Sequence, residues 1–308
     1  MINNRLIIIL GPTASGKTRL AVDLALDLGG EVISADSRQV FRGMDIGTGK
    51  DLGEYQRGGC SVPYHLIDHK EAGELYNVQE FKDDFYQAHE GIIAREALPV
   101  LCGGTGMYIH SLLQKQDYTA IPVDEELRSK LYNTEVAHLR DLLSEYPEAH
   151  TSHADRSSHK RLIRAIEIAE YLGKYNFSAQ DRPVLNPVVI GLELSVESRR
   201  ARIASRLQQR LKNGLIEEVQ MLLDKGISKE TLIYYGLEYK FVTQHLIGML
   251  TYKELEERLI IAIQQFAKRQ MTFFRKMEKD GVHIHWLNAD GHLLKDQLVR
   301  ILEMEHLV

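Results

Sequence analysis

The feature that most constrains the fold is an apolar run that leads directly into a glycine-bracketed loop. Residues 6–10 read Leu-Ile-Ile-Ile-Leu, and residues 11–18 read Gly-Pro-Thr-Ala-Ser-Gly-Lys-Thr. The loop fits the pattern G-x-x-x-x-G-K-[ST], whose backbone N–H groups cradle phosphates between a strand and the N-terminus of a helix. Ala21, Leu24 and Leu28 follow at helical spacing. These residues therefore predict the first strand and the first helix of an α/β sheet.

Three more apolar runs extend this alternation of strands and helices. They span residues 31–35, 98–102 and 188–192. Asp36 follows the first run, and Gly103-Gly-Thr-Gly106 follows the second before a helix opens at Met107. Strands separated by helical segments indicate a parallel sheet, and ligands bind beyond the carboxyl ends of its strands. We therefore expect the loop, Asp36 and Thr105 to meet in one site.

The middle of the chain has a different composition and a different periodicity. Residues 117–183 are charged and helix-like and carry no strand signal, and long amphipathic helices fill the C-terminal third. One of these helices separates its apolar and basic side chains into two stripes, Ile203, Leu207 and Leu211 against Arg202, Arg206 and Arg210. The simplest architecture is a P-loop NTPase-like α/β core with a parallel sheet, residues 1–116 and 184–308, interrupted by a helical insertion domain, residues 117–183.

Charge and cysteine usage narrow the class of protein. The formal net charge of −5 argues against coating nucleic acid by bulk electrostatics, but it permits local basic surfaces. Three basic clusters occur, at residues 156–164, 199–212 and 268–276, and each alone is typical of a solvated helix face. No apolar stretch approaches the roughly 20 residues of a membrane span. Two cysteines are too few for a disulfide framework, so we expect a cytoplasmic protein with no membrane partner.

The side chains at the expected site indicate phosphate chemistry without naming the ligand. Lys17 offers a positive charge to phosphates, and the Thr18 hydroxyl is placed to ligate Mg²⁺. Asp36 can be a metal ligand, a general base or a helix cap, and the glycines at 103–106 can admit a ligand or merely form a turn. Nucleotide hydrolases hold Mg²⁺ with an acidic residue after a further strand, whereas the run 98–102 ends in glycines. The pattern therefore favours a small transferase over a motor ATPase.

The order of several longer motifs resembles a known family, the tRNA dimethylallyltransferases (tRNA isopentenyltransferases) of the bacterial type. The matching segments cover nearly the whole chain: residues 11–18, Ile33-Ser-Ala-Asp-Ser-Arg-Gln-Val-Phe41, Met44-Asp-Ile-Gly-Thr48, His65-Leu-Ile-Asp68, Gly103-Gly-Thr-Gly-Met-Tyr-Ile109, Lys160-Arg-Leu-Ile-Arg-Ala-Ile-Glu167 and Ala267-Lys-Arg-Gln-Met-Thr-Phe-Phe-Arg275. So many motifs in the family's order are far more specific than the phosphate loop alone.

The resemblance implies a reaction and roles for the site residues. A dimethylallyl group moves from dimethylallyl diphosphate to N6 of the adenosine 3′-adjacent to the anticodon of tRNA, and diphosphate leaves. The diphosphate would be bound by Gly11, Pro12, Thr13, Ala14, Ser15, Gly16, Lys17 and Thr18, with Mg²⁺ as cofactor on Thr18. Asp36 would act as the general base, and the catalytic Thr105 would form a hydrogen bond near the diphosphate or the reacting amine. We also expect the protein to be a monomer.

The resemblance also implies which residues bind tRNA. Asp36, Ser37, Arg38, Gln39 and Thr105 would surround the flipped base, and Arg128, Lys160, Arg161 and Arg164 would contact the anticodon stem-loop from the insertion. Along a helix, Lys160 and Arg164 share a face, whereas Arg161 points about 100° away. We therefore expect Lys160 and Arg164 to face RNA together, and a structural ion pair is the alternative role for Arg161.

Some features depart from the family pattern or leave alternatives open. The family's usual pair of histidines appears as Tyr64-His65, and its Ile-Gly-Tyr-Lys-Glu motif is only loosely matched at residues 235–240. The aromatic rings of Phe266, Phe273 and Phe274 are interpreted as core packing rather than as base-stacking surfaces. A small-molecule or nucleoside kinase would use the same loop for ATP. A catalytically silent RNA-binding paralogue is a further alternative, and the presence of Lys17, Thr18, Asp36 and Thr105 argues against it. The basic segment at 268–270, together with the cluster at 160–164, favours the RNA-modifying enzyme over the kinase.

Overall fold

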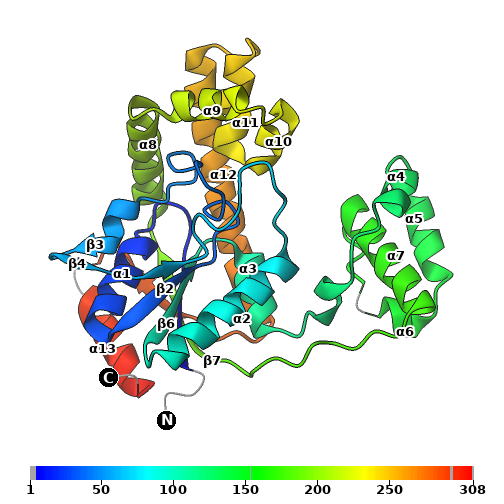
Figure 1. Ribbon diagram of the computed structural model, residues 1–308, viewed down its shortest axis with the longest axis horizontal. Helices are drawn as coiled ribbons and strands as arrows, with labels where there is room; N and C mark the ends of the chain where they lie inside the picture. Colours follow the sequence, from blue (N-terminus) through cyan, green and yellow to red (C-terminus); the bar gives the residue numbers. More distant parts are fainter. Residues whose placement is uncertain (1–4, 153, 292–293, 307–308) are drawn as a thin grey trace. The chain divides into compact units, whose positions relative to one another are not determined.

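A six-stranded parallel sheet forms the centre of the protein. The computed structural model describes residues 5–152, 154–291 and 294–306. The strand order is β5-β2-β6-β1-β7-β8, and each neighbouring pair is parallel (Figure 1). The strands are β1 (Arg5–Leu10), β2 (Gly30–Ser34), β5 (Tyr64–His65), β6 (Leu98–Gly103), β7 (Asn186–Glu193) and β8 (His285–Asn288). The predicted parallel α/β core is confirmed.

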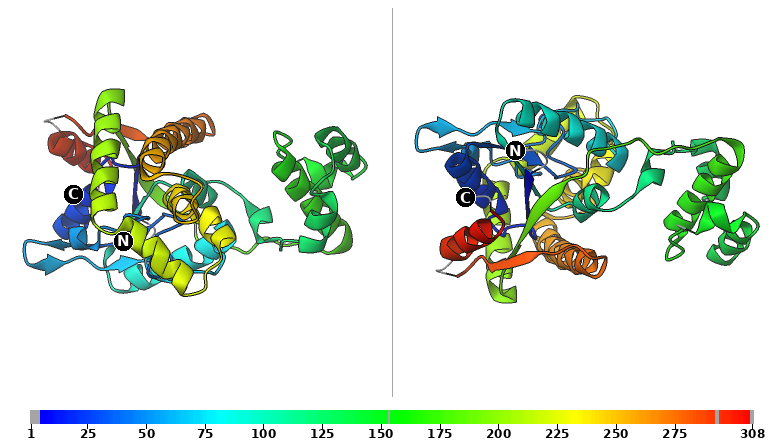
Figure 2. Two further views of the ribbon diagram at one scale, coloured as in Figure 1. Left: turned by 90° about the horizontal axis from the view of Figure 1, so that it is seen from above. Right: turned by 90° about the horizontal axis from the view of Figure 1, so that it is seen from below.

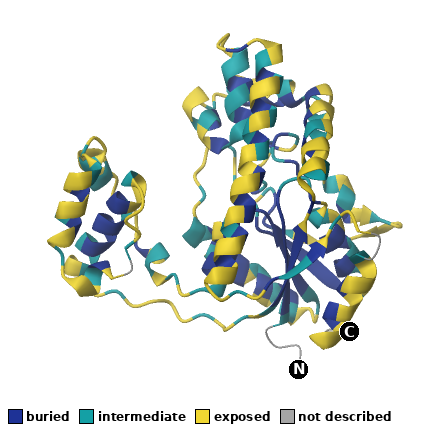
Figure 3. Cartoon of the chain, turned by 180° about the vertical axis from the view of Figure 1, so that it is seen from behind, coloured by how far each residue is buried: buried dark blue, intermediate teal, exposed yellow. Residues whose placement is uncertain are grey.

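Both faces of the sheet are buried, as the continuous apolar character of β1 requires. Ile7 and Ile9 pack on one face with α1 (Lys17–Leu28) and α13 (Leu294–Met304). Leu6 and Ile8 pack on the other face with α2 (Val78–Ala94), α3 (Gly106–Leu113) and the second half of α12 (Tyr252–Lys279). The two sets of helices can be followed in Figure 2, and Figure 3 shows the buried strands between them.

A helical layer extends from the carboxyl ends of the strands. It contains α8 (Val196–Lys212), α9 (Leu215–Asp224), α10 (Lys229–Tyr235), α11 (Leu237–Leu246) and the first half of α12. The predicted apolar stripe of α8 is buried, and it packs with Phe41 and Met44 from the segment that follows β2. This packing fixes the segment after β2, which carries Asp36, against the helical layer.

The chain divides into two compact units, residues 1–114 with 184–308 and residues 115–183. The second unit consists of η2 (Asp117–Ala120), α4 (Glu125–Leu131), α5 (Val136–Ser144), α6 (Glu148–Thr151) and α7 (His159–Lys174). Leu139 and Leu143 of α5 pack against Leu162 and Ile166 of α7 in a core of its own. The second unit starts at residue 115, two residues before the predicted start at residue 117. The sequence of the preceding turn carries no clear boundary signal.

Several short elements were not predicted from the sequence. Strand β5 has two residues, too few for a periodic pattern, and β3 (Gln56–Arg57) and β4 (Cys60–Ser61) form an equally short antiparallel hairpin after η1 (Leu52–Tyr55). Within the described part of the chain, no helix combines the length and the apolar character needed to cross a membrane.

Candidate functional site

The phosphate loop joins β1 to α1 in the geometry that its glycines allow. Gly16 precedes the first residue of α1 with φ of 88°, a left-handed conformation that favours glycine, and Ala14 also has a positive φ of 63°. Lys17 is the first residue of the helix, and its ammonium lies 3.4 Å from the carbonyl oxygen of Pro12. The N–H groups of the first helical turn therefore point out of the helix end, where an anion is stabilised.

A buried glutamine fixes this loop to the turn after β6. The side chain of Gln270 on α12 accepts a hydrogen bond from Thr13 N at 2.9 Å and donates one to Gly104 O at 2.9 Å. A side chain at residue 104 would place its Cβ 2.4 Å from Gln270 Nε2, so this contact requires glycine there. Gln270 belongs to the basic segment 268–270, whose sequence favours an RNA-modifying enzyme. In the structure the Gln270 side chain positions the phosphate loop.

Asp36 and Thr105 lie together at the carboxyl ends of β2 and β6. Asp36 Oδ1 accepts a hydrogen bond from Arg38 N at 2.9 Å, and Thr105 Oγ1 accepts one from Ser37 N at 3.1 Å. Asp36 therefore does cap the following turn, as the simplest interpretation predicted. Among the described residues the second carboxylate oxygen has no hydrogen bond, so the capping role leaves one oxygen available for chemistry.

Eight of the expected site residues line one cavity of about 380 Å³, termed the central cavity. Its lining includes Thr13, Lys17, Thr18, Asp36, Ser37, Arg38, Gln39 and Thr105. A second, outer cavity of about 740 Å³ shares Lys17 and Thr18 with it. The structure thus brings the loop and both strand ends to one place, as expected. Glycines 11 and 16 belong to the loop framework: Gly11 is buried and Gly16 is exposed.

Two arginines of α8 also line both cavities, which corrects the interpretation of their cluster as a solvated face. Arg206 donates to Gly49 O at 3.4 Å and pairs with Asp51, and Arg210 donates to Gly47 O at 3.3 Å. Burial lowers the pKa of Lys17, and the charges of Arg206 and Arg210 act in the same direction. Burial, followed by the charge of Arg206, likewise lowers the pKa of Arg210. Three cations therefore border one space, where a bound anion would be attracted to all of them.

A second carboxylate lies in the central cavity beside these cations. Glu238 at the start of α11 lines the cavity and pairs with Arg210 at 3.3 Å. Burial raises the pKa of Glu238, and the charge of Arg210 opposes this shift. The strand-end pattern singled out Asp36 but not Glu238, because Glu238 is supplied by a later helix.

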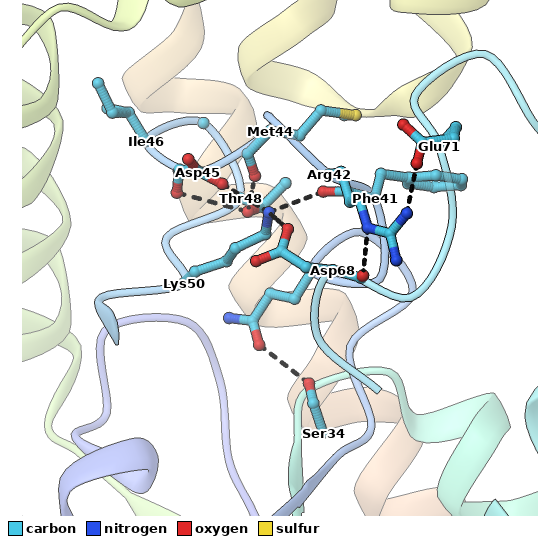
Figure 4. Close-up of polar contacts among 12 residues, drawn as sticks. Ser34, Phe41, Arg42, Met44, Asp45, Ile46, Thr48, Lys50, Asp68 and Glu71 are labelled. Carbon is cyan, nitrogen blue, oxygen red and sulfur yellow. Dashed lines mark hydrogen bonds and ion pairs between the residues drawn. The ribbon is translucent and has the colours of Figure 1, made fainter. Parts of the chain in front are cut away.

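The wall of the central cavity at residues 47–49 is held by a buried lysine. Lys50, whose side chain is 1% exposed, donates to Phe41 O at 2.7 Å, Asp45 Oδ1 at 2.6 Å and Asp68 Oδ1 at 2.5 Å (Figure 4). Both carboxylates fall within motifs that the sequence singled out, at 44–48 and 65–68. Their common partner was not identified, since no local pattern distinguishes a buried lysine from a surface one.

The same wall is held from the helical layer by a buried glutamate. The carboxylate of Glu218 accepts hydrogen bonds from the backbone N–H groups of Asp45, Ile46 and Gly47 at 2.7–3.0 Å, and from the Tyr239 hydroxyl at 2.7 Å. A side chain at residue 47 would meet the Tyr239 ring within 2.8 Å. Lys50 and Glu218 therefore make the cavity wall a rigid part of the site.

In the second unit, the expected RNA-binding arginines take different directions. Arg164 donates to the carbonyl oxygens of Tyr118, Ile121 and Pro122, at 3.1, 2.6 and 3.2 Å. It therefore does not share the exposed face of Lys160, because its guanidinium satisfies three backbone acceptors instead. This part of the expectation is wrong.

The other three cations that were expected to contact RNA remain at least partly exposed. Arg161 pairs with Asp155 at 2.8 Å, so its structural ion pair is confirmed, while Lys160 is exposed. Arg128 Nε contacts the buried carboxylate of Glu167 at 2.8 Å, although 38% of the Arg128 side chain remains exposed. The described residues contain no group of three or more His, Cys, Asp or Glu side chains arranged to hold a metal.

Comparisons with known proteins agree on one family. A family model described as IPP transferase matches residues 39–277, and one described as isopentenyl transferase matches residues 4–58. A tRNA dimethylallyltransferase 1 of Porphyromonas gingivalis is 51% identical over 92% of this chain and 94% of its own length. A tRNA dimethylallyltransferase 2 of Phocaeicola vulgatus is 48% identical over 98% and 97%. The crystal structure of a tRNA isopentenylpyrophosphate transferase from Bacillus halodurans aligns with a TM-score of 0.72, at 33% identity, over 99% of this chain and 96% of that one.

Proposed function

The chain belongs to the tRNA dimethylallyltransferase family, and from that premise we propose its reaction. It transfers a dimethylallyl group from dimethylallyl diphosphate to N6 of the adenosine 3′-adjacent to the anticodon in tRNA, and it releases diphosphate. The observation that carries the proposal is the shared lining of the central cavity. Phosphate-binding groups, represented by Lys17 and Arg206, lie around the same space as Asp36 and Thr105.

The loop and the cations suit a diphosphate. Backbone N–H groups at the N-terminus of α1 offer hydrogen bonds to its oxygens. Lys17, Arg206 and Arg210 line the cavity and offer positive charge. Negative charge grows on the diphosphate as its bond to the prenyl carbon breaks, and fixed cations stabilise that charge without reorganising. Arg206 and Arg210 are held in place by Asp51 and Glu238, so they are already positioned when the anion binds.

The oxygen ligands at the loop also fit Mg²⁺. Thr18 and Asp36 both line the central cavity, and Mg²⁺ is commonly held by one or two protein oxygens together with substrate phosphates rather than by a complete protein cage. Thr18 would hold the ion against the diphosphate, where it would supply further charge stabilisation to the leaving group. The lack of a larger cluster of acidic side chains in the described residues is compatible with this arrangement.

Asp36 is assigned to the acceptor amine. The lone pair of N6 is delocalised into the adenine ring, so the amine is a poor nucleophile. A carboxylate that accepts its proton while the new C–N bond forms contributes a factor of roughly 10²–10⁴ in rate. Asp36 has one oxygen bound to Arg38 N and one available, and Thr105 is held beside it through Ser37 N. The target adenosine would have to leave its stack to reach these groups, at a cost of a few kcal/mol.

The second unit is assigned to the anticodon stem. Lys160 is exposed on α7, and the partly exposed Arg128 is oriented by Glu167, so these two cations are available to phosphates. Arg161 is engaged by Asp155 and stabilises the unit. Arg164 contributes indirectly, because it holds the segment that begins this unit. Phosphate contacts of this kind position an RNA without reading its sequence.

A labelling experiment tests the function directly. Wild-type protein is incubated with tRNA and either labelled dimethylallyl diphosphate or labelled ATP, and the tRNA nucleosides are analysed by mass spectrometry. We expect a dimethylallyl-adenosine product, competition by inorganic diphosphate, and loss of donor binding in Lys17→Ala. Lys276→Ala is the matched control, because Lys276 is 59% exposed and pairs only with its helical neighbour Asp280. Label that moves from ATP to a small acceptor, with none reaching tRNA from the prenyl donor, would overturn the assignment in favour of a kinase.

A further inference from the structure

Two large aromatic side chains are exposed at the mouth of the central cavity. Tyr234, the penultimate residue of α10, is 61% exposed, and Phe266 on α12 is 41% exposed. Phe266 lines the cavity, and the two neighbours of Tyr234, Ile233 and Tyr235, line it as well. Rings of this size are normally buried because they carry a large apolar area. Core packing, the expectation for the phenylalanines of α12, holds for the fully buried Phe274 but is wrong for Phe266.

Each exposed ring lies next to a guanidinium. The Arg38 guanidinium is 5.4 Å from the centroid of the Tyr234 ring, and its Nη2 donates to Tyr234 O at 3.2 Å. The Arg269 guanidinium is 6.0 Å from the centroid of the Phe266 ring. Both arginines line the same cavity. The mouth therefore presents two pairs of a planar ring with a planar cation. Arg38 and Tyr234 are 196 residues apart in the sequence, whereas Phe266 and Arg269 both belong to α12.

This combination matches single-stranded RNA better than a purely apolar partner. Unpaired bases are recognised by stacking on aromatic rings and on arginine planes, while the phosphates between them are attracted by positive charge. Lys240 adds a further cation to the lining of the cavity. A protein or lipid partner would need a continuous apolar surface, whereas here each ring lies beside a guanidinium.

We propose that Tyr234 and Phe266 form a stacking platform for the bases next to the modified adenosine. This inference rests on the proposed function, because it takes the cavity between the rings and Asp36 as the place of the flipped base. Flipping one base out of the anticodon loop leaves its neighbours with exposed faces at the mouth. The two rings cover those faces, and the energy of stacking offsets part of the cost of extracting the adenosine.

The test compares variants of both rings on an anticodon stem-loop RNA. Binding is measured by fluorescence anisotropy, prenylation by single-turnover assay, and donor affinity by competition with inorganic diphosphate. Tyr234→Ala and Phe266→Ala should each weaken RNA binding about 5- to 150-fold, the range for loss of one base–aromatic stack, with donor affinity unchanged. Tyr234→Phe and Phe266→Tyr keep a ring and should restore binding. Tyr252→Ala is the matched control, since Tyr252 is 49% exposed on α12 but does not line the cavity.

A second measurement separates stacking from a general loss of structure. RNA with an abasic nucleotide on either side of the target should bind wild type more weakly, and the alanine variant that lost the corresponding ring should show no additional loss. Full RNA affinity in both alanine variants, with prenylation intact, would refute the platform while the proposed function stands. Failure of the wild-type protein to bind and prenylate the RNA would instead refute both.

Discussion

Replacing Lys50 by methionine should lower the free energy of unfolding of the core unit by about 2–4 kcal/mol. Lys50 is 1% exposed and its ammonium donates to one carbonyl and two carboxylates. The carbonyl belongs to the buried Phe41, and a buried acceptor left without a partner costs about 1–3 kcal/mol. Methionine keeps most of the aliphatic stem, so little is added for a cavity.

The two carboxylates contribute less than their short distances suggest. Asp45 is 59% exposed and Asp68 is 34% exposed, so water can solvate both once the ammonium is gone. Pairs with exposed partners are worth about 0–1 kcal/mol each. The cost of the unpaired Phe41 carbonyl and the loss of the two ion pairs together give the expected decrease of about 2–4 kcal/mol.

The measurement is urea unfolding at neutral pH followed by the fluorescence of Trp286. Trp286 is the single tryptophan of the chain and lies in β8, so it reports on the core unit and not on the insertion. Lys276→Met is the control, because an exposed lysine paired along its own helix should change stability by less than about 0.5 kcal/mol. A loss below about 1 kcal/mol in Lys50→Met would mean that water replaces all three contacts of Lys50, and the reasoning would fail.

Three further predictions concern single groups. Asp36→Asn should lower the single-turnover rate roughly 10²-fold or more while leaving RNA affinity nearly unchanged, and a near-normal rate would reduce Asp36 to a turn cap. Burial raises the pKa of Cys102 to about 12, so iodoacetamide at about pH 8 should alkylate the exposed Cys60 in native protein and Cys102 only after denaturation. Equal labelling rates by mass spectrometry would contradict this. Hydrogen bonding to Arg95 lowers the pKa of Glu31, so its ionised form stabilises the folded protein above the unfolded pKa and this contribution is lost as pH falls through the folded pKa. Glu31→Gln should therefore be less stable than wild type by about 1 kcal/mol at neutral pH, with a difference that closes below about pH 4 and that denaturant titrations at several pH values would measure.

Local sequence was sufficient for the strand ends that carry the site. The loop at 11–18, Asp36 and the turn at 103–106 each follow an apolar run, and a parallel sheet necessarily collects such ends at one edge. The structure accordingly places all three around the central cavity. These predictions needed only the order of strands, not the packing of side chains.

The contacts that hold the site together could not be predicted in the same way. Gln270 bonds to Thr13 across 257 residues of sequence, and no pattern within α12 specifies that partner. Helical periodicity placed Arg206 and Arg210 on one stripe of α8. Periodicity alone does not show whether that stripe faces a cavity or the solvent. For Phe266, the apolar residue type and the helical spacing predicted burial, but the ring is partly exposed to solvent.

The insertion has a consequence for how the sheet assembles in time. Central strand β1 pairs with β6 on one side and with β7 on the other, yet residues 115–183 separate those two partners along the chain. Within the insertion, the rings of Tyr118 and Phe177 lie 5.6 Å apart, so its first and last segments are already close. The entropic cost of closing a loop grows with the logarithm of its flexible length. If the insertion folds first, the flexible length between β6 and β7 is shorter, and the cost of bringing these strands together falls by roughly 1–2 kcal/mol. Docking of β7 onto β1 is therefore kinetically coupled to the folding of the insertion, and variants that loosen the insertion should slow refolding of a sheet they do not touch.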